Sequence, residues 1–227
     1  MADKKISALT ELATPADGDK IPIVDVSDTT QAASGTTKFI QKLNLAPSAV
    51  WSLLEEVVCS GQSSIDFNGN GSSYADMADT TYEAFKVVFV NVKPSSDARF
   101  DIQIIDNGSA LATTNYHTAF RYHASTGQTQ DSDSAAANQG YVTQKTVESD
   151  AYYPGVSAEI FVPVLNDNLN AHGVVSGVLA NSTTMMRIVG AWEHRNGGSY
   201  TDIQGISFYT SSGNFASGKI LLYGLTA

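Results

Sequence analysis

Short apolar runs separated by turn residues follow one another along most of this chain. Residues 82–92 form a long β-branched run, and residues 99–105 alternate cleanly between apolar and polar side chains. Residues 106–109 contain an Asn-Gly pair, which predicts a tight hairpin turn. Residues 125–139 are polar, and we expect a long surface loop there. Further strands are predicted over residues 65–67, 116–123, 140–147, 158–164, 172–179, 184–192, 203–209 and 219–224.

Residues 50–59 are ambiguous by propensity, because their composition also suits a helix. A strand is favoured because a turn cluster follows at residues 60–64 and a period-two pattern at 65–67. The fold class predicted is therefore all-β: a jelly-roll-like antiparallel β-sandwich with an extended N-terminal arm. The best boundary lies at Ala46-Pro47, which gives an arm over residues 1–46 and a sandwich over 47–227.

The arm contains ordered apolar residues but too few of them to bury a core of its own. A segment of this kind needs a neighbour to cover it, so we interpret it as an attachment element. The alternative is an ordinary N-terminal hairpin that packs on its own domain. The apolar residues of the arm are Ile6, Leu9, Leu12, Ile21, Ile23, Val24, Val26, Phe39, Ile40 and Leu43.

The amino-acid sequence of the arm resembles a known type of segment. The strings KISALTEL and PADGDKIPIVDVSDTTQAASGTTKFI resemble the N-terminal segment that opens many tailed-phage virion proteins, including fibres and other appendages. The resemblance implies that residues 1–46 dock to capsid or tail proteins and that the chain is made in a host cytoplasm and resides in the virion. The docking interface implied is Ile6, Leu9, Leu12, Ile21, Ile23, Val24, Val26, Phe39 and Ile40.

A second resemblance covers residues 50–225. The strings WSLLEEVVCSGQSSIDF, YEAFKVVFVNVKPSSDARFDIQIIDNG and SGNFASGKILLYGL are similar to a β-sandwich found at the C-terminal end of phage fibre-like and other virion-surface proteins. It implies a homotrimer serving as a short fibre, a head fibre or a decoration subunit. After residues 107–109 this chain is polar and short where that family has a longer aromatic hairpin. Ligands bound by the family's surface loops therefore do not transfer.

The charge and the cysteine content of the chain limit which partners and which chemistry are expected. Only 16% of residues are charged, the formal net charge is −10 and the sequence pI is about 4.6. Such acidity argues against nucleic acid, whose phosphates require basic patches, and suits solubility before assembly. Cys59 is the only cysteine, and we expect it to be a small buried hydrophobe. No leader pattern and no apolar run of ~20 residues is present, so no membrane insertion is expected.

Two sequence motifs resemble ligand loops. Residues 213–219 have the glycine and lysine spacing of a phosphate loop, but Ile220 stands where a Ser or Thr is required. Asp66, Asn68 and Asn70 match the first half of a calcium loop, whose closing glutamate would fall at Met77. We reject the phosphate loop because no helix follows. For the second motif, a bound cation and an Asn-Gly turn both remain open.

Catalysis is not predicted. The four histidines show no paired spacing for zinc. Nothing in the sequence shows that the scattered carboxylates Asp101, Glu159, Glu193 and Asp202 converge as a glycosidase pair would. We assign no catalytic, cofactor-binding or metal-ligating residue and expect a non-enzymatic structural protein.

The remaining candidate is a binding function. Tyr152 and Tyr153 lie in an apparent turn, where they could stack on a host surface glycan, although core or interface packing is the commoner fate of such residues. The alternative function is therefore a host-receptor, glycan-binding module of a tail fibre.

Overall fold

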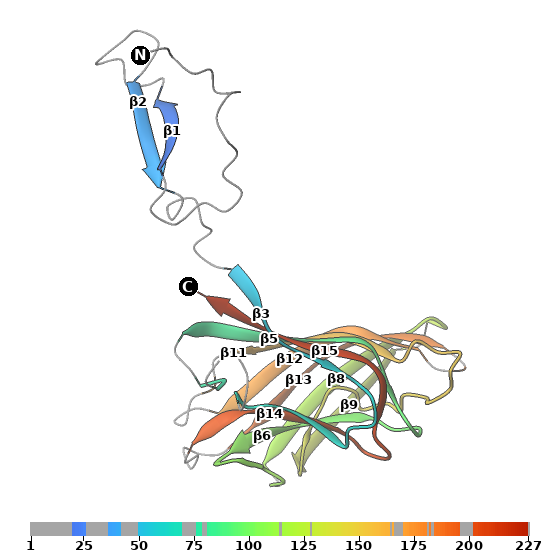
Figure 1. Ribbon diagram of the computed structural model, residues 1–227. Coiled ribbons are helices and arrows are strands. Elements are labelled where there is room, and N and C mark those ends of the chain that lie inside the picture. The colour runs from blue at the N-terminus through green and yellow to red at the C-terminus, as the bar shows by residue number, and fades with distance from the viewer. Residues whose placement is uncertain are drawn as a thin grey trace. The chain divides into compact units, whose positions relative to one another are not determined.

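The computed structural model describes residues 20–25, 36–41, 50–69, 76–78, 81–113, 115–127, 129–163, 165, 170–180, 182, 184–195 and 202–226. The chain forms two compact units, Met1–Ser48 and Ala49–Ala227 (Figure 1). All regular secondary structure in the described residues is β-strand, and every paired strand is antiparallel. The all-β prediction is confirmed.

The first unit contains one antiparallel pair, β1 (Lys20–Asp25) and β2 (Thr36–Gln41). Its register runs from Lys20 opposite Gln41 to Asp25 opposite Thr36. The β-branched residues of β1, Ile21, Ile23 and Val24, favour an extended backbone.

The second unit contains two antiparallel sheets. The larger sheet has eight strands in the spatial order β3 (Val50–Val58), β15 (Phe215–Thr226), β5 (Tyr82–Pro94), β11 (Val156–Pro163), β12 (Ala171–Ala180), β13 (Met185–His194), β8 (Tyr116–Ala124) and β9 (Thr129–Ala137). The smaller sheet has the order β10 (Gly140–Tyr141), β6 (Phe100–Asp106), β14 (Ile203–Thr210) and β4 (Ser64–Phe67), and β7 (Ser109–Ala110) pairs with β6.

The two sheets face each other across one apolar core, as in a β-sandwich. In β11, Val156, Ala158 and Ile160 are buried while the residues between them are exposed, because alternate side chains of a strand point to opposite faces. The Phe89 ring of β5 lies 5.2 Å from the Phe208 ring of β14, which joins the two layers directly. Cross-layer aromatic contacts of this kind bury large apolar areas.

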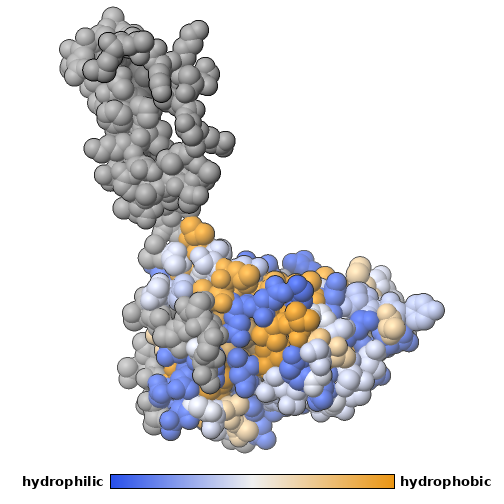
Figure 2. Space-filling view, in the orientation of Figure 1, coloured by the Kyte–Doolittle hydropathy of each residue, from blue (hydrophilic) through white to orange (hydrophobic). Residues whose placement is uncertain are grey.

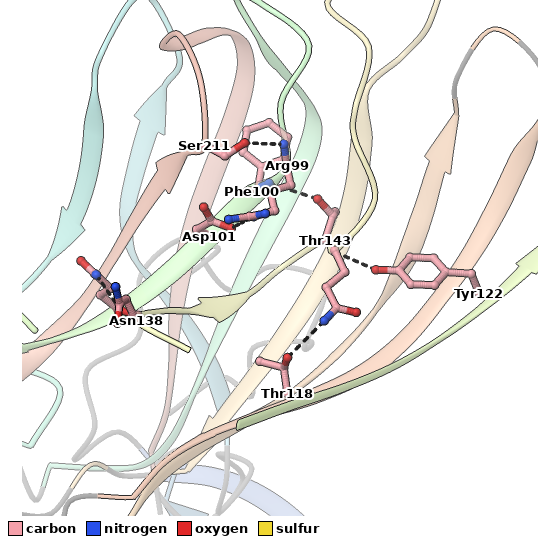
Figure 3. A network of polar contacts seen from close by, with 10 residues as sticks. Arg99, Phe100, Asp101, Thr118, Tyr122, Asn138, Thr143 and Ser211 are labelled. Atoms are coloured by element: carbon pink, nitrogen blue, oxygen red, sulfur yellow. Dashed lines mark hydrogen bonds and ion pairs between the residues drawn. The ribbon is translucent and has the colours of Figure 1, made fainter. Parts of the chain in front are cut away.

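Polar groups also join the layers, through the segment after β10 (Figure 3). The backbone N–H groups of Val142 and Thr143 donate to the carbonyl of Phe100, and the Thr143 hydroxyl accepts from the Phe100 N–H at 3.1 Å. The next residue, Gln144, donates its N–H to the Tyr122 hydroxyl of β8 at 2.6 Å. The N–H groups of three successive residues, 142 to 144, therefore find acceptors as this segment crosses between the layers, as burial requires.

Tyr116 of β8 makes a second link between the layers. Its hydroxyl accepts from the N–H of Ile104 in β6 at 2.8 Å and donates to the carbonyl of Leu111 at 3.0 Å. Both Tyr116 and Ile104 are fully buried. The hydroxyl thus hydrogen-bonds two backbone groups that no neighbouring strand of the smaller sheet pairs with.

Two strand predictions are wrong in extent. Residues 125–139 were expected to be a loop but include β9, which pairs with β8. An edge strand needs little apolar content, because one strand neighbour suffices to align its backbone, so its polar sequence lacked the alternating signal. Residues 140–147 were expected to be a strand, yet only Gly140–Tyr141 pairs regularly because the chain then crosses between the layers.

Other local predictions are confirmed. Residues 50–59 form the strand β3 rather than a helix. Asn107 and Gly108 have φ values of 49° and 73°, as a two-residue hairpin turn between β6 and β7 requires. Cys59 is buried, and burial raises the pKa of its thiol to about 11.

We expect Tyr116→Phe and Tyr122→Phe each to lower the free energy of unfolding by ~1–3 kcal/mol, because the first leaves the buried N–H of Ile104 and the second the partly buried N–H of Gln144 without this acceptor. Tyr152→Phe is the matched control, since Tyr152 is 91% exposed and its hydroxyl has no such role. Urea denaturation measures all three variants. If the two buried variants match the control, the hydroxyls do not hold the layers together.

Candidate functional site

The hairpin of the first unit carries part of the predicted docking interface. β1 holds Ile21, Ile23 and Val24, and β2 holds Phe39 and Ile40. The register places Ile21 directly opposite Ile40, so apolar positions meet across the pair. A two-stranded hairpin is marginally stable alone, so a second surface would stabilise it. The other members of the predicted interface lie outside the described residues: Ile6, Leu9, Leu12 and Val26.

Tyr152 and Tyr153, the residues predicted to contact a surface ligand, differ in their exposure to solvent. Tyr152 is 91% exposed, whereas Tyr153 is half-buried. The Tyr152 N–H donates to the Asp150 carboxylate at 2.9 Å, and Lys93 Nζ donates to the carbonyl oxygens of Asp150 and Ala151. The loop thus presents one aromatic ring to a ligand rather than two.

The carboxylates considered for catalysis do not converge. Glu159 lies 3.9 Å from Lys86, and Glu193 lies 2.8 Å from Arg195. These two glutamates stand on strands separated by β12, and strand geometry puts their backbones roughly 15 Å apart. Asp101 belongs to the other sheet, and Asp202 accepts the Asn107 N–H through its carbonyl, so its backbone lies six residues, or roughly 20 Å, along the β6 direction from Asp101. The carboxylates therefore lie too far apart to form the pair that a glycosidase requires.

A row of three polar residues crosses β8, β13 and β12. His117 lies opposite Glu193, which in turn lies opposite His172. The carboxylate of Glu193 accepts from Arg195 Nε at 2.8 Å and from Asn170 Nδ2 at 3.1 Å. The hydrogen bond from Arg195 lowers the pKa of Glu193, partial burial opposes it, and the Asn170 hydrogen bond and nearby positive charge add to the lowering. This carboxylate is therefore ionised and already bonded.

The described residues offer neither a metal-binding cluster nor a membrane-spanning helix. In the part of the chain that the structure describes, no group of three or more His, Cys, Asp or Glu side chains is arranged to hold a metal ion. In those same ranges there is also no helix long and apolar enough to cross a bilayer.

The half calcium loop is described only in part. Asp66 accepts a hydrogen bond from the Ser207 hydroxyl at 2.6 Å, and Asn70 lies outside the described residues. Met77, at the position of the closing ligand, is fully buried in the apolar core. Residues 213–219, the rejected phosphate loop, run into the strand β15.

The largest feature that the sequence did not single out is the solvent face of the eight-stranded sheet. We define the outer apolar face as Ala119, Phe161, Val174, Val178, Val189 and Ala191, which lie on β8, β11, β12 and β13.

Strand register makes this face continuous. Val174 lies opposite Phe161 on one side and opposite Ala191 on the other. Phe161 is 43% exposed and Val174 is 51% exposed. Large apolar side chains exposed on adjacent strands mark interaction surfaces in soluble proteins.

Aromatic residues continue this surface across β5, β15 and β3. The Trp51 ring meets the Phe161 ring edge-on, with centroids 6.4 Å apart. Lys86 Nζ lies 5.1 Å from the centre of the Trp51 ring and 5.4 Å from that of Tyr223. Figure 2 shows hydrophobic residues gathered where Figure 1 labels β3, β5 and β15, and exposed Leu53 lies on this part of the sheet.

The face is hollowed in two places. One hollow of about 720 Å³ lies over β8, β12 and β13 and includes Val174, Ala191 and Glu193 in its lining. A second, of about 410 Å³, lies over β5, β11 and β12 beside Val88 and Glu159. A relief of this kind suits interlocking with another surface.

The outward side of the smaller sheet carries polar groups, and most of them are buried, including Asp101, Gln103 and Ser207. Ser207 bonds Asp66 there, and the hollow beside them, of about 290 Å³, is also lined by Gln103 and Tyr209. Asp101 is 1% exposed and lies 2.8 Å from Arg99 Nε. Burial raises the pKa of Asp101 to about 6, although the adjacent Arg99 charge and hydrogen bond act in the opposite direction. The outward sides of the two sheets therefore differ: the larger sheet exposes apolar side chains, whereas the smaller sheet carries mostly covered polar groups.

Comparison with protein-family models, with curated proteins and with solved structures finds no match to this chain. The fold and its surfaces are therefore the basis for a functional proposal.

One signal in the sequence could have identified the outer apolar face. Residues 172–179 read HGVVSGVL, with apolar side chains at positions of both parities, which is typical of a strand covered on both faces. Alternation of apolar and polar residues predicts a strand but does not predict that its second face is also apolar.

Two buried groups should give opposing pH dependences of stability. The folded-state pKa of Asp101 is raised from 3.8 to about 6, so its contribution to stability falls as pH rises through that window. His194 is fully buried, and burial lowers its pKa from 6.5 to about 4, so its contribution falls as pH drops through nearly the same window. We expect the two to offset each other in the wild-type protein.

Relative to wild type, Asp101→Asn should therefore gain stability as pH rises from 4 to 6.5, and His194→Gln should lose stability over the same rise. Each difference should be on the order of 2 kcal/mol across the window. Urea denaturation at several pH values gives both difference curves, in which the titration of other carboxylates cancels. Parallel curves for all three proteins would refute the assignment.

Proposed function

We propose that this chain is a non-enzymatic structural protein of a tailed-phage virion. In this proposal residues 1–46 dock to a capsid or tail surface, and the sandwich projects as part of a short fibre, head fibre or decoration subunit, assembled as a homotrimer. The observation that carries the proposal is the division into two units, of which the first pairs apolar positions in a hairpin that is too small to be stable by itself.

The surfaces of the second unit support an assembly role more than a catalytic one. The carboxylates weighed for catalysis are spread over two sheets, and Glu159 and Glu193 lie beside separate cations. The most extended exposed feature is apolar and lies on the larger sheet. Exposed apolar sheet faces suit contacts between proteins, and the carboxylate that lines the larger hollow, Glu193, is already bonded to Arg195 and Asn170.

Removal of residues 1–46 tests the docking role. The sandwich core lies within residues 49–227, so the truncated protein should keep its unfolding temperature within a few degrees while being lost from phage particles. Circular dichroism measures the first property, and protein blotting of purified particles measures the second. Incorporation of the truncated protein at the wild-type level would contradict the proposal.

Point variants in the hairpin sharpen that test. Ile21→Asp combined with Ile40→Asp replaces one opposed apolar pair and should reduce incorporation at least tenfold, since each buried aliphatic side chain contributes ~1.5–3 kcal/mol. Lys20→Ser combined with Gln41→Ser changes the neighbouring polar pair and is the matched control. Equal incorporation of the two double variants would show that the apolar positions of the hairpin do not dock.

A second candidate function is binding of a host glycan through the exposed ring of Tyr152. The observation in its favour is the 91% exposure of that side chain on a loop held by Lys93 and Asp150. Exposed aromatic rings can stack on the apolar face of a sugar. A glycan array comparing wild type with Tyr152→Ala decides between the two: no binding by the wild-type protein rejects the glycan function.

A further inference from the structure

We propose that copies of this chain bind one another through the outer apolar face, with the adjoining aromatic cluster of Trp51, Phe161 and Tyr223 at the contact. The evidence for self-association comes from the surface of the sandwich alone. The number of copies, three, rests on the proposed function.

The outer apolar face has the composition of a protein interface. Trp51, Phe161 and Tyr223 bring three aromatic rings around Lys86, and aromatic anchors of this kind dominate the energy of protein contacts. Val174 extends the apolar surface next to Phe161. The inner face of the same strands already fills the core, so a core role cannot account for these outward side chains.

Charge points to a second copy as the occupant. The chain carries a net charge of −10, so identical copies repel each other unless they meet over a surface whose charge is balanced. On this sheet Glu159 lies 3.9 Å from Lys86 and Glu56 lies 2.6 Å from Lys219.

Two further features complete the balance. Glu193 lies 2.8 Å from Arg195, and the arginines Arg121 and Arg187 of β8 and β13 offset Asp131 and Asp133, which β9 places opposite Arg121 and Ala119. The charges of this sheet are therefore nearly balanced and most of the excess negative charge of the chain lies elsewhere, so two acidic copies approach over this surface at low cost.

The area available is sufficient for a stable contact. The seven strands from β3 to β8 span ~29 Å at a spacing of about 4.8 Å, and the outward positions 117 to 123 of β8 span about 20 Å along the strand. The footprint is therefore roughly 580 Å² on each copy, or about 1,160 Å² in total, above the ~1,000 Å² that a specific interface should exceed.

Site-directed cross-linking gives a positive test. In the full-length chain, Val174→Cys places a thiol on the outer apolar face, while the native Cys59 is buried and its thiol pKa is raised to about 11, so it reacts little. A short bis-maleimide should link Val174→Cys into covalent dimers. The matched control Ser64→Cys, on the exposed side of the smaller sheet, should remain monomeric on a denaturing gel.

Sedimentation of uncross-linked protein gives the complementary result. Wild type should sediment as an oligomer, and the double variant Phe161→Lys with Val174→Lys should show a dissociation constant at least about tenfold higher. Ser64→Lys is the control for added charge. Both substituted positions are already exposed, and circular dichroism checks that the sandwich remains folded.

A monomeric wild type, equal association of the lysine variant and the control, or equal cross-linking of Val174→Cys and Ser64→Cys would each overturn the self-association. If a variant still forms oligomers but is no longer incorporated into particles, the defect lies in docking through residues 1–46 and not in self-association. The failure of this inference is therefore distinguishable from the failure of the docking role.

Discussion

The two hydroxyl groups of Tyr116 and Tyr122 are the constraint on which the arrangement of this sandwich depends. Both side chains stand on β8 of the larger sheet and reach backbone N–H groups outside it, the buried one of Ile104 and the partly buried one of Gln144. Burial raises the pKa of Tyr122 to about 12, so its hydroxyl stays neutral in the core. A buried N–H without an acceptor costs more than most single apolar contacts contribute, so these bonds fix the register of one layer on the other.

Because the core is filled from both sheets, the functional properties lie in what each sheet presents outward. The smaller sheet presents hydrogen-bonded polar groups, whereas the larger sheet presents apolar and aromatic side chains with balanced charges. An asymmetry of this kind suits a subunit that faces solvent on one side and identical neighbours on the other. The hairpin of the first unit would add a separate point of attachment, so assembly and docking use different parts of the chain.

The sequence predicted most strands because β-branched runs and the Asn-Gly pair report local backbone preferences directly, as at Asn107 and Gly108. The sequence did not predict β9, because its polar residues pair with β8 through backbone groups and leave no pattern in the side chains. The outer apolar face could not be predicted as a surface, because only the strand order brings Phe161, Val174 and Ala191 side by side. The opposing environments of Asp101 and His194 likewise depend on burial.

A reconstruction of the intact phage particle by electron cryomicroscopy tests the central claim most directly. The account predicts sandwiches that project from the particle with their eight-stranded sheets turned toward one another and residues 1–46 at the attachment point. Absence of the chain from the particle, or a sandwich seated against the particle by its outer apolar face, would contradict it.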